Sequence, residues 1–173
     1  VPDLAALAEH MERRLVRESA AVGDAELFVT ALLLEFPPDR AEVRVVDRGH
    51  PGPILIRHGR ATKMPTRPGV PLGLGALAAV PDEPTAATTH PLAPGDVLVL
   101  HTDGVSEARG ADGAFYPTEE RLSLRFGGRT RIEPATVAAF LRDDLADYAD
   151  GTGADDIAVL ALSRTDRSAD QVY

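Results

Sequence analysis

The chain has 173 residues, 44% of them apolar, and its 27 acidic and 18 basic side chains give a net charge of −9. The length favours one domain, here residues 1–164 with a polar tail over 165–173. The negative charge argues against nucleic-acid and membrane partners, and the absence of cysteine excludes disulfides and thiolate chemistry. No apolar run has the ~20 residues of a membrane span and no signal-peptide pattern opens the chain, so we expect a cytoplasmic protein.

The first part of the chain predicts one helix followed by strands. Apolar residues recur every three or four positions at the start and predict a helix over residues 2–19. Several later segments have the continuous or alternating apolar pattern of strands. The segment at 27–36 is expected to be buried, and the one at 97–102 gives the strongest strand signal in the chain. The predicted strands are residues 27–36, 43–47, 54–57, 61–64, 85–92 and 97–102. A hairpin turn is expected at His58-Gly59-Arg60, and the Pro- and Gly-rich residues 65–83 predict an irregular connection.

The remainder predicts two helices and a final strand. Thr118 is expected to cap the first helix, and the second begins at Pro134 and ends at Gly151-Thr152-Gly153. Residues 157–162 predict a last buried strand. Because strands mostly precede helices rather than alternate with them, the fold class is α+β with a largely antiparallel sheet.

Carboxylates stand at the ends of the two strongest strands. Asp103, followed by Gly104, comes directly after strand 97–102, and Asp155 and Asp156 come directly before strand 157–162. If these strands are antiparallel neighbours, the carboxylates lie at one edge of the sheet. Carboxylate oxygens suit a hard cation such as Mg²⁺ or Mn²⁺. Taken singly, however, an Asp-Gly step is typical of a turn and an Asp pair of a solvated loop, so that interpretation stays open.

The other polar residues predict no second catalytic chemistry. The five histidines lack the spacing of a zinc site, and His50, between Gly49 and Pro51, is expected to be a loop histidine satisfied by backbone. No serine stands in a Gly-x-Ser-x-Gly elbow, and no phosphate-binding glycine loop is present. Asp24 is interpreted as a residue of a surface loop.

The order of several short motifs resembles a known family. Phe28-Val29-Thr30, Gly49-His50-Pro51, Pro71-Leu72-Gly73 and the Leu-Ala-Pro-Gly-Asp segment at 92–96 come first. The most specific stretch follows, the Thr-Asp-Gly-Val-Ser-Glu-Ala-Arg sequence at 102–109, and Asp155-Asp156-Ile157 comes last. Over residues 27–163 this succession resembles the C-terminal two-thirds of PPM-type metal-dependent serine/threonine phosphatases, in their bacterial SpoIIE/RsbU-like branch.

The resemblance implies a β-sandwich flanked by helices, with two Mn²⁺ or Mg²⁺ ions at one end. By motif match, Asp103 and Asp155 would be metal ligands, and Asp156 would support them from beside the site. Gly104 would let the backbone pass close to the metal. The implied activity is hydrolysis of phosphoserine or phosphothreonine by a metal-activated water, with no catalytic residue beyond the metal ligands. Family substrates are commonly STAS-domain antagonists of anti-sigma factors.

The chain departs from the family pattern in three places. The Gly-Asp-x-x-Asp and Gly-Asp-Val-x-Gly-x-Gly segments, which supply central metal ligands, are absent. Asp47-Arg48 replaces the usual Asn-Ala, and His101 stands where tyrosine is common. The first departure implies a fold incomplete at its N-terminus, an incomplete metal site and a chain inactive by itself. The two retained aspartates favour a fragment of an enzyme over a degenerate relative.

The alternative function is a non-catalytic PPM-fold module that binds a regulatory partner. The missing strands would also leave a sheet edge open, which favours self-association into a homodimer.

Overall fold

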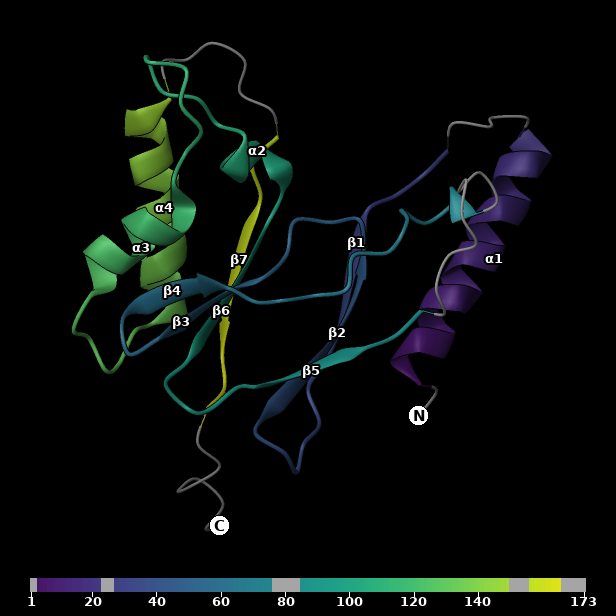
Figure 1. Cartoon of the computed structure of the whole chain (residues 1–173), viewed down its shortest axis with the longest axis horizontal. Coiled ribbons are helices and arrows are strands. Elements are labelled where there is room, and N and C mark those ends of the chain that lie inside the picture. The colour runs from purple at the N-terminus through teal and green to yellow at the C-terminus, as the bar shows by residue number, and fades with distance from the viewer. Residues whose placement is uncertain (1–2, 23–26, 76–84, 150–155, 166–173) are drawn as a thin grey trace, which may run out of the picture. The chain divides into compact units, whose positions relative to one another are not determined.

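The computed structural model describes residues 3–22, 27–75, 85–149 and 156–165 (Figure 1). The helices are α1 (Leu4–Val22), α2 (Asp103–Ser106), α3 (Thr118–Phe126) and α4 (Pro134–Tyr148). The strands are β1 (Ala31–Glu35), β2 (Glu42–Arg48), β3 (Ile54–Arg57), β4 (Arg60–Lys63), β5 (Thr88–Pro91), β6 (Val97–His101) and β7 (Val159–Ser163). Every pairing between these strands is antiparallel, which confirms the predicted α+β class. The contacts divide the chain into two compact units, 1–52 with 65–91 and 53–64 with 92–173.

The first unit is a three-stranded sheet in the order β1-β2-β5, packed against helix α1. Leu4 and Ala8 lie one helical turn apart on α1 and bury against Leu33 of β1 and Val46 of β2, which pair across the sheet. The Asp47 carboxylate at the end of β2 is buried and accepts a hydrogen bond of 2.6 Å from the Thr66 hydroxyl. Asp47 therefore has a structural role where the family pattern has asparagine.

The prediction of one buried strand over 27–36 is wrong in its extent. Strand β1 covers only Ala31–Glu35, and Phe28, Val29 and Phe36 are 43–51% exposed. Val29 instead exchanges two backbone hydrogen bonds of 2.9 Å with Leu72 in the Pro71-Leu72-Gly73 motif. The segment before β1 is thus extended, but it pairs with a loop. The strand predicted over 85–92 is likewise shorter, Thr88–Pro91.

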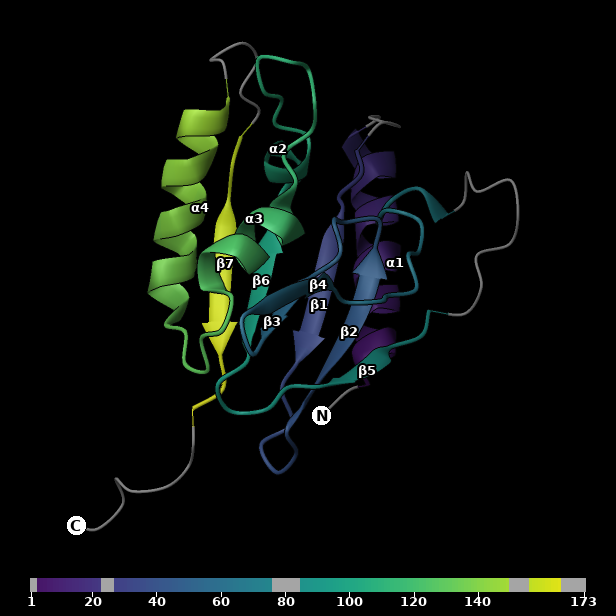
Figure 2. The same ribbon diagram turned by 60° about the vertical axis from the view of Figure 1, so that its left-hand side comes forward.

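The second unit is a four-stranded sheet in the order β4-β3-β6-β7, with α3 and α4 packed on it (Figure 2). Ile54 and Ile56 of β3, Val97 and Val99 of β6, and the buried residues of both helices form one core. On α4 these are Val137, Leu141 and Leu145. The sequence periodicity predicts one apolar stripe from these three residues and Tyr148, and Tyr148 is partly buried against the same core.

The predicted hairpin turn between β3 and β4 is confirmed. His58 and Gly59 both have positive φ, 50° and 77°, as a two-residue turn of this hand requires. A Cβ atom at Gly59 would overlap the carbonyl oxygen of Phe126, so glycine is also needed for the close approach of the turn to α3.

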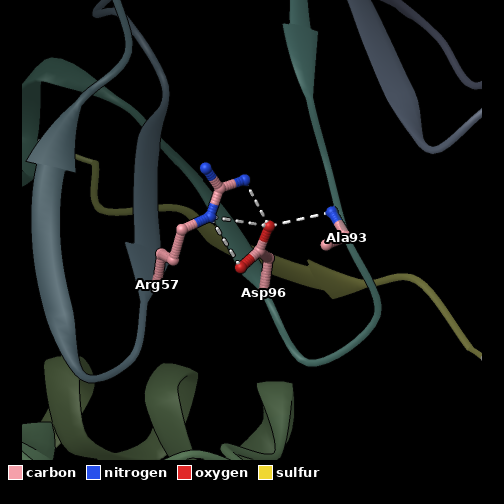
Figure 3. A network of polar contacts seen from close by, with 3 residues as sticks. All are labelled: Arg57, Ala93 and Asp96. Atoms are coloured by element: carbon pink, nitrogen blue, oxygen red, sulfur yellow. Dashed lines mark hydrogen bonds and ion pairs between the residues drawn. The ribbon is translucent and has the colours of Figure 1, made fainter.

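A buried aspartate fixes the beginning of β6 (Figure 3). The Asp96 carboxylate accepts hydrogen bonds from Arg57 Nη2 on β3 at 2.6 Å and from the backbone N–H of Ala93 at 2.8 Å. The hydrogen bond to Asp96 raises the pKa of Arg57. The aspartate of the Leu-Ala-Pro-Gly-Asp motif therefore joins a turn to the neighbouring strand.

The Asp-Gly step after β6 starts the short helix α2, so the simple turn left open as an alternative does not form. Two local predictions in this unit are wrong. Thr118 is the buried first residue of α3, the N-cap position is Pro117, and no side chain caps the helix. Strand β7 is not buried, because among the described strands only β6 pairs with it, and Leu160 is 53% exposed. The glycines expected to end α4 lie outside the described residues.

Within the described ranges, no helix combines the length and the hydrophobicity of a transmembrane segment.

Candidate metal centre

The candidate site lies where β6 ends and β7 begins. These strands are antiparallel neighbours, with a register that runs from Val97 opposite Ser163 to His101 opposite Val159. The residues after His101 and those before Val159 therefore meet at one end of the sheet. This is the strand arrangement on which the sequence interpretation depended.

Thr102 joins the two segments at this end. Its backbone N–H donates to the carbonyl of Ala158 at 3.1 Å, so the pairing continues one residue beyond β6. Its hydroxyl donates to the carbonyl of Asp156 and accepts from the N–H of Ala158, both at 2.9 Å. One hydroxyl thus uses its donor and an acceptor to hold residues 156–158 against the end of β6. The sequence analysis named Thr102 only as the first residue of the family-like stretch 102–109 and predicted no role for its hydroxyl.

Asp103 is the first residue of α2, and its side chain is exposed. Its Oδ1 accepts a hydrogen bond of 3.0 Å from the N–H of buried Gly104, the only donor to this carboxylate among the described residues. The carboxylate therefore keeps acceptor capacity toward solvent. It is an oxygen ligand of the kind that Mg²⁺ and Mn²⁺ prefer, so the residue fits a metal-ligating role.

The second predicted ligand, Asp155, lies outside the described residues, as does Asp24. Asp156 is exposed, and its backbone carbonyl is held by Thr102. The structure thus brings Asp103 and Asp156 to the same end of the sheet, while the pairing of Asp103 with Asp155 stays a prediction. In the described part of the chain, no three His, Asp or Glu side chains gather as a metal-binding group.

The histidines of the family motifs have structural partners. His50 is half-buried, with Nδ1 at 3.1 Å from the Thr30 hydroxyl, and its backbone N–H donates to Asp47 Oδ1. The expectation that backbone groups satisfy the His50 ring is wrong for this nitrogen, because the partner is a side chain. His101 is buried at the end of β6, with Nδ1 at 3.0 Å from the carbonyl of Thr102.

The loop that follows α2 is fixed to α3 and α4 by a polar cluster. The Tyr116 hydroxyl donates to Asp144 Oδ2 at 2.6 Å, and Arg121 Nε lies 3.0 Å from the same oxygen. Burial and the hydrogen bond to Asp144 raise the pKa of Tyr116. Near the tip of the loop, the Arg109 guanidinium lies 4.0 Å from the centre of the Phe115 ring. This loop borders the chain segment that carries Asp103. Residues 112–116 and 120–122 also belong to the succession of motifs that resembles the family, but the sequence predicted none of these side-chain contacts.

The two antiparallel sheets with their helices have the fold of PPM-type phosphatase domains, also called PP2C. The family model described as Stage II sporulation protein E (SpoIIE) matches residues 2–165. The chain belongs to the SpoIIE family, which confirms the resemblance to the SpoIIE/RsbU-like branch. No curated protein sequence matches the chain.

Solved structures share the fold at low sequence identity. The phosphatase domain of the cell fate determinant SpoIIE from Bacillus subtilis has a TM-score of 0.63 and 14% identity, covering 98% of this chain and 77% of that one. The RsbU and RsbW domains of Rv1364c from Mycobacterium tuberculosis give a TM-score of 0.62 at 18% identity, covering 92% and 47%. The catalytic domain of the serine/threonine protein phosphatase PstP, in complex with two manganese ions, gives 0.61 at 16%, covering 96% and 74%.

Proposed function

We propose that the chain contributes to the hydrolysis of phosphoserine or phosphothreonine on a bacterial signalling protein. The observation that carries the proposal is the Thr102 hydrogen-bond pair, which brings the segment before β7 to the end of β6 beside Asp103. Membership of the SpoIIE family supports a metal-dependent protein phosphatase. The manganese ions of PstP, a structure with the same fold, support Mn²⁺ as the cofactor.

In this proposal Asp103 and Asp155 are the metal ligands that this chain supplies. Bound Mn²⁺ or Mg²⁺ would lower the pKa of a water molecule and neutralise charge on the phosphate. Asp103 offers an exposed carboxylate at a fixed strand end, and Gly104 orients it through the N–H bond to Oδ1. The Thr102 hydroxyl holds the backbone carbonyl of Asp156 at the end of the sheet that carries Asp103. Asp156 would stand beside the metal ligands and support them, and would not itself bind the metal.

The substrate is proposed to be a phosphorylated STAS-domain protein, in keeping with the branch of the family that the motifs resemble. Its recognition would take place in the cytoplasm. A homodimer remains part of the proposal because β7 is an edge strand among the described strands.

The test is phosphate release from a phosphoserine protein by the natural protein that carries these residues, with and without Mn²⁺. Asp103→Asn is expected to reduce kcat by at least about a hundredfold, since a ligand that loses its charge holds the metal poorly. Asp147→Asn, an exposed carboxylate on α4, is the matched control and should retain activity. Calorimetric titration with Mn²⁺ gives the second readout, in which Asp103→Asn should weaken binding. Metal-dependent release that is equal in the two variants would contradict the assignment of Asp103.

A non-catalytic binding module would give no Mn²⁺-dependent release from any phosphoprotein, so the same assay separates the two functions.

A further inference from the structure

The second unit has a hollow at the opposite end of β6 and β7 from Asp103. Its volume is about 530 Å³, within the usual range for small-ligand sites. Three segments form its walls: the turn that contains Gly95 before β6, the connection from α3 to α4, and the residues after β7. All of them belong to the same compact unit. We call it the arginine hollow, after Arg131 and Arg164 in its lining.

The lining of the arginine hollow suits an anion. Among the described lining residues, Arg131 and Arg164 supply two guanidinium groups and Glu133 the one carboxylate, in a chain whose net charge is −9. Arg131 has no carboxylate partner among the described residues and stands on the loop before α4. The hydroxyls of Thr130, Ser163 and Thr165 add hydrogen-bond donors. Guanidinium and hydroxyl groups together are the usual partners of phosphate oxygens.

The hollow is separate from the candidate metal centre. Ser163 pairs with Val97 at the first residue of β6, whereas Asp103 stands two residues after its last residue, His101. Four strand steps at ~3.4 Å each place roughly 14 Å of sheet between the two ends. A ligand in the hollow would therefore neither need a metal at Asp103 nor contact it.

We propose that the arginine hollow is a binding site for the phosphate group of a small ligand, either inorganic phosphate or a phosphorylated amino acid. Arg131 and Arg164 would hold the phosphate oxygens from two sides, and the hydroxyls would complete its hydrogen bonds. None of the described lining residues is aromatic, so they offer no stacking surface for a nucleobase. Recognition of the phosphate group itself is thus the chemistry that the hollow provides.

The test is a titration of the 173-residue chain with sodium phosphate and, separately, with O-phospho-L-serine, followed by amide NMR at constant ionic strength. We expect saturable shifts centred on the amides of Gly95, Thr130 and Thr165. Similar affinity for both compounds identifies phosphate as the recognised group. Tighter binding of phosphoserine shows that its amino-acid part also contacts the hollow. Constant ionic strength is essential because simple screening also weakens contacts between exposed charges.

Arg131→Ala and Arg164→Ala should each weaken binding by about tenfold, the loss expected for one charge-assisted hydrogen bond. Arg142→Ala is the matched control: Arg142 is an exposed arginine on α4, paired with Asp143 at 2.8 Å and outside the lining. It should leave the affinity unchanged. The proposal is overturned if shifts do not saturate, if Arg131→Ala binds as wild type does, or if all three arginine variants lose affinity equally. None of these outcomes depends on phosphatase activity.

Discussion

Replacing Thr102 by valine would test whether the two strand ends at the candidate metal centre are joined as described. Valine keeps the branched shape and the strand preference of threonine but removes the hydroxyl. The variant loses the bond to the Asp156 carbonyl and the bond from the Ala158 N–H. A typical hydrogen bond contributes about 0.5–1.5 kcal/mol, so two would contribute about 1–3 kcal/mol. Because Thr102 is only half-buried, water can replace part of the two lost hydrogen bonds, so we expect the free energy of unfolding to fall by about 1 kcal/mol.

Urea denaturation would measure the free energy of unfolding, and thermal melting should show a fall of roughly 2–4 °C for a domain of this size. Amide exchange gives the local readout, since the Ala158 N–H should exchange faster in Thr102→Val. Thr102→Ser retains the hydroxyl and is the control that should keep Ala158 protected. If Ala158 exchanges at the same rate in the valine variant and in wild type, residues 156–158 are not held by this side chain, and the proposal that Asp155 joins Asp103 as a metal ligand loses its support.

Two further substitutions test the rest of the second unit. Asp96→Asn should lower the free energy of unfolding, measured by urea denaturation, by about 1–2 kcal/mol, because it removes the charge of the buried carboxylate that pairs with Arg57. The loss is limited because the Arg57 side chain is 39% exposed. Asp143→Asn, in an exposed pair, should have no measurable effect, and equal losses would refute a special role for Asp96. The raised pKa of Tyr116 favours the neutral phenol in the folded state, so its contribution is present below the ordinary pKa of 10.0 and is lost as the pH rises above it. Tyr116→Phe should therefore destabilise at neutral pH, and its deficit relative to wild type should shrink in denaturation series above pH 10.0; a constant deficit would contradict this.

Much of the fold could be predicted because local patterns and tertiary contacts agree there. The residues of β6 form a continuous apolar run, and Val97, Leu98 and Val99 are buried. The apolar stripe of α4 was likewise visible from its spacing of four. The failures occur where neighbours decide the outcome. Leu160 has the apolar character of a buried strand residue, yet β7 lies at a sheet edge, which no local pattern reveals.

The candidate metal centre likewise has residues that the sequence predicted and residues that it did not. Asp103 could be placed at a strand end because Asp-Gly followed a strong apolar run, and its position at the start of α2 agrees with that prediction. The Thr102 hydroxyl bonds to a residue 54 positions away, a contact that depends on the register of β6 with β7. The Tyr116–Asp144 bond spans 28 positions and two elements. Contacts between side chains so far apart in the sequence follow no periodicity or motif, so a single sequence does not predict them.

The β6–β7 pair has chemically different ends, and this asymmetry links the two proposals while keeping them separable. One end carries Asp103 and the segment leading from Asp156, whose carboxylates suit cations. The other carries Arg164 and faces Arg131, which suit anions. Both ends depend on one register, so a change that slips the strands would disturb cation and phosphate binding together. A change confined to one end would not, because five paired positions of β6 intervene. Thr102→Val should accordingly leave phosphate affinity at the arginine hollow intact, whereas loss of both functions would mean that the hydroxyl sets the register of the whole pair.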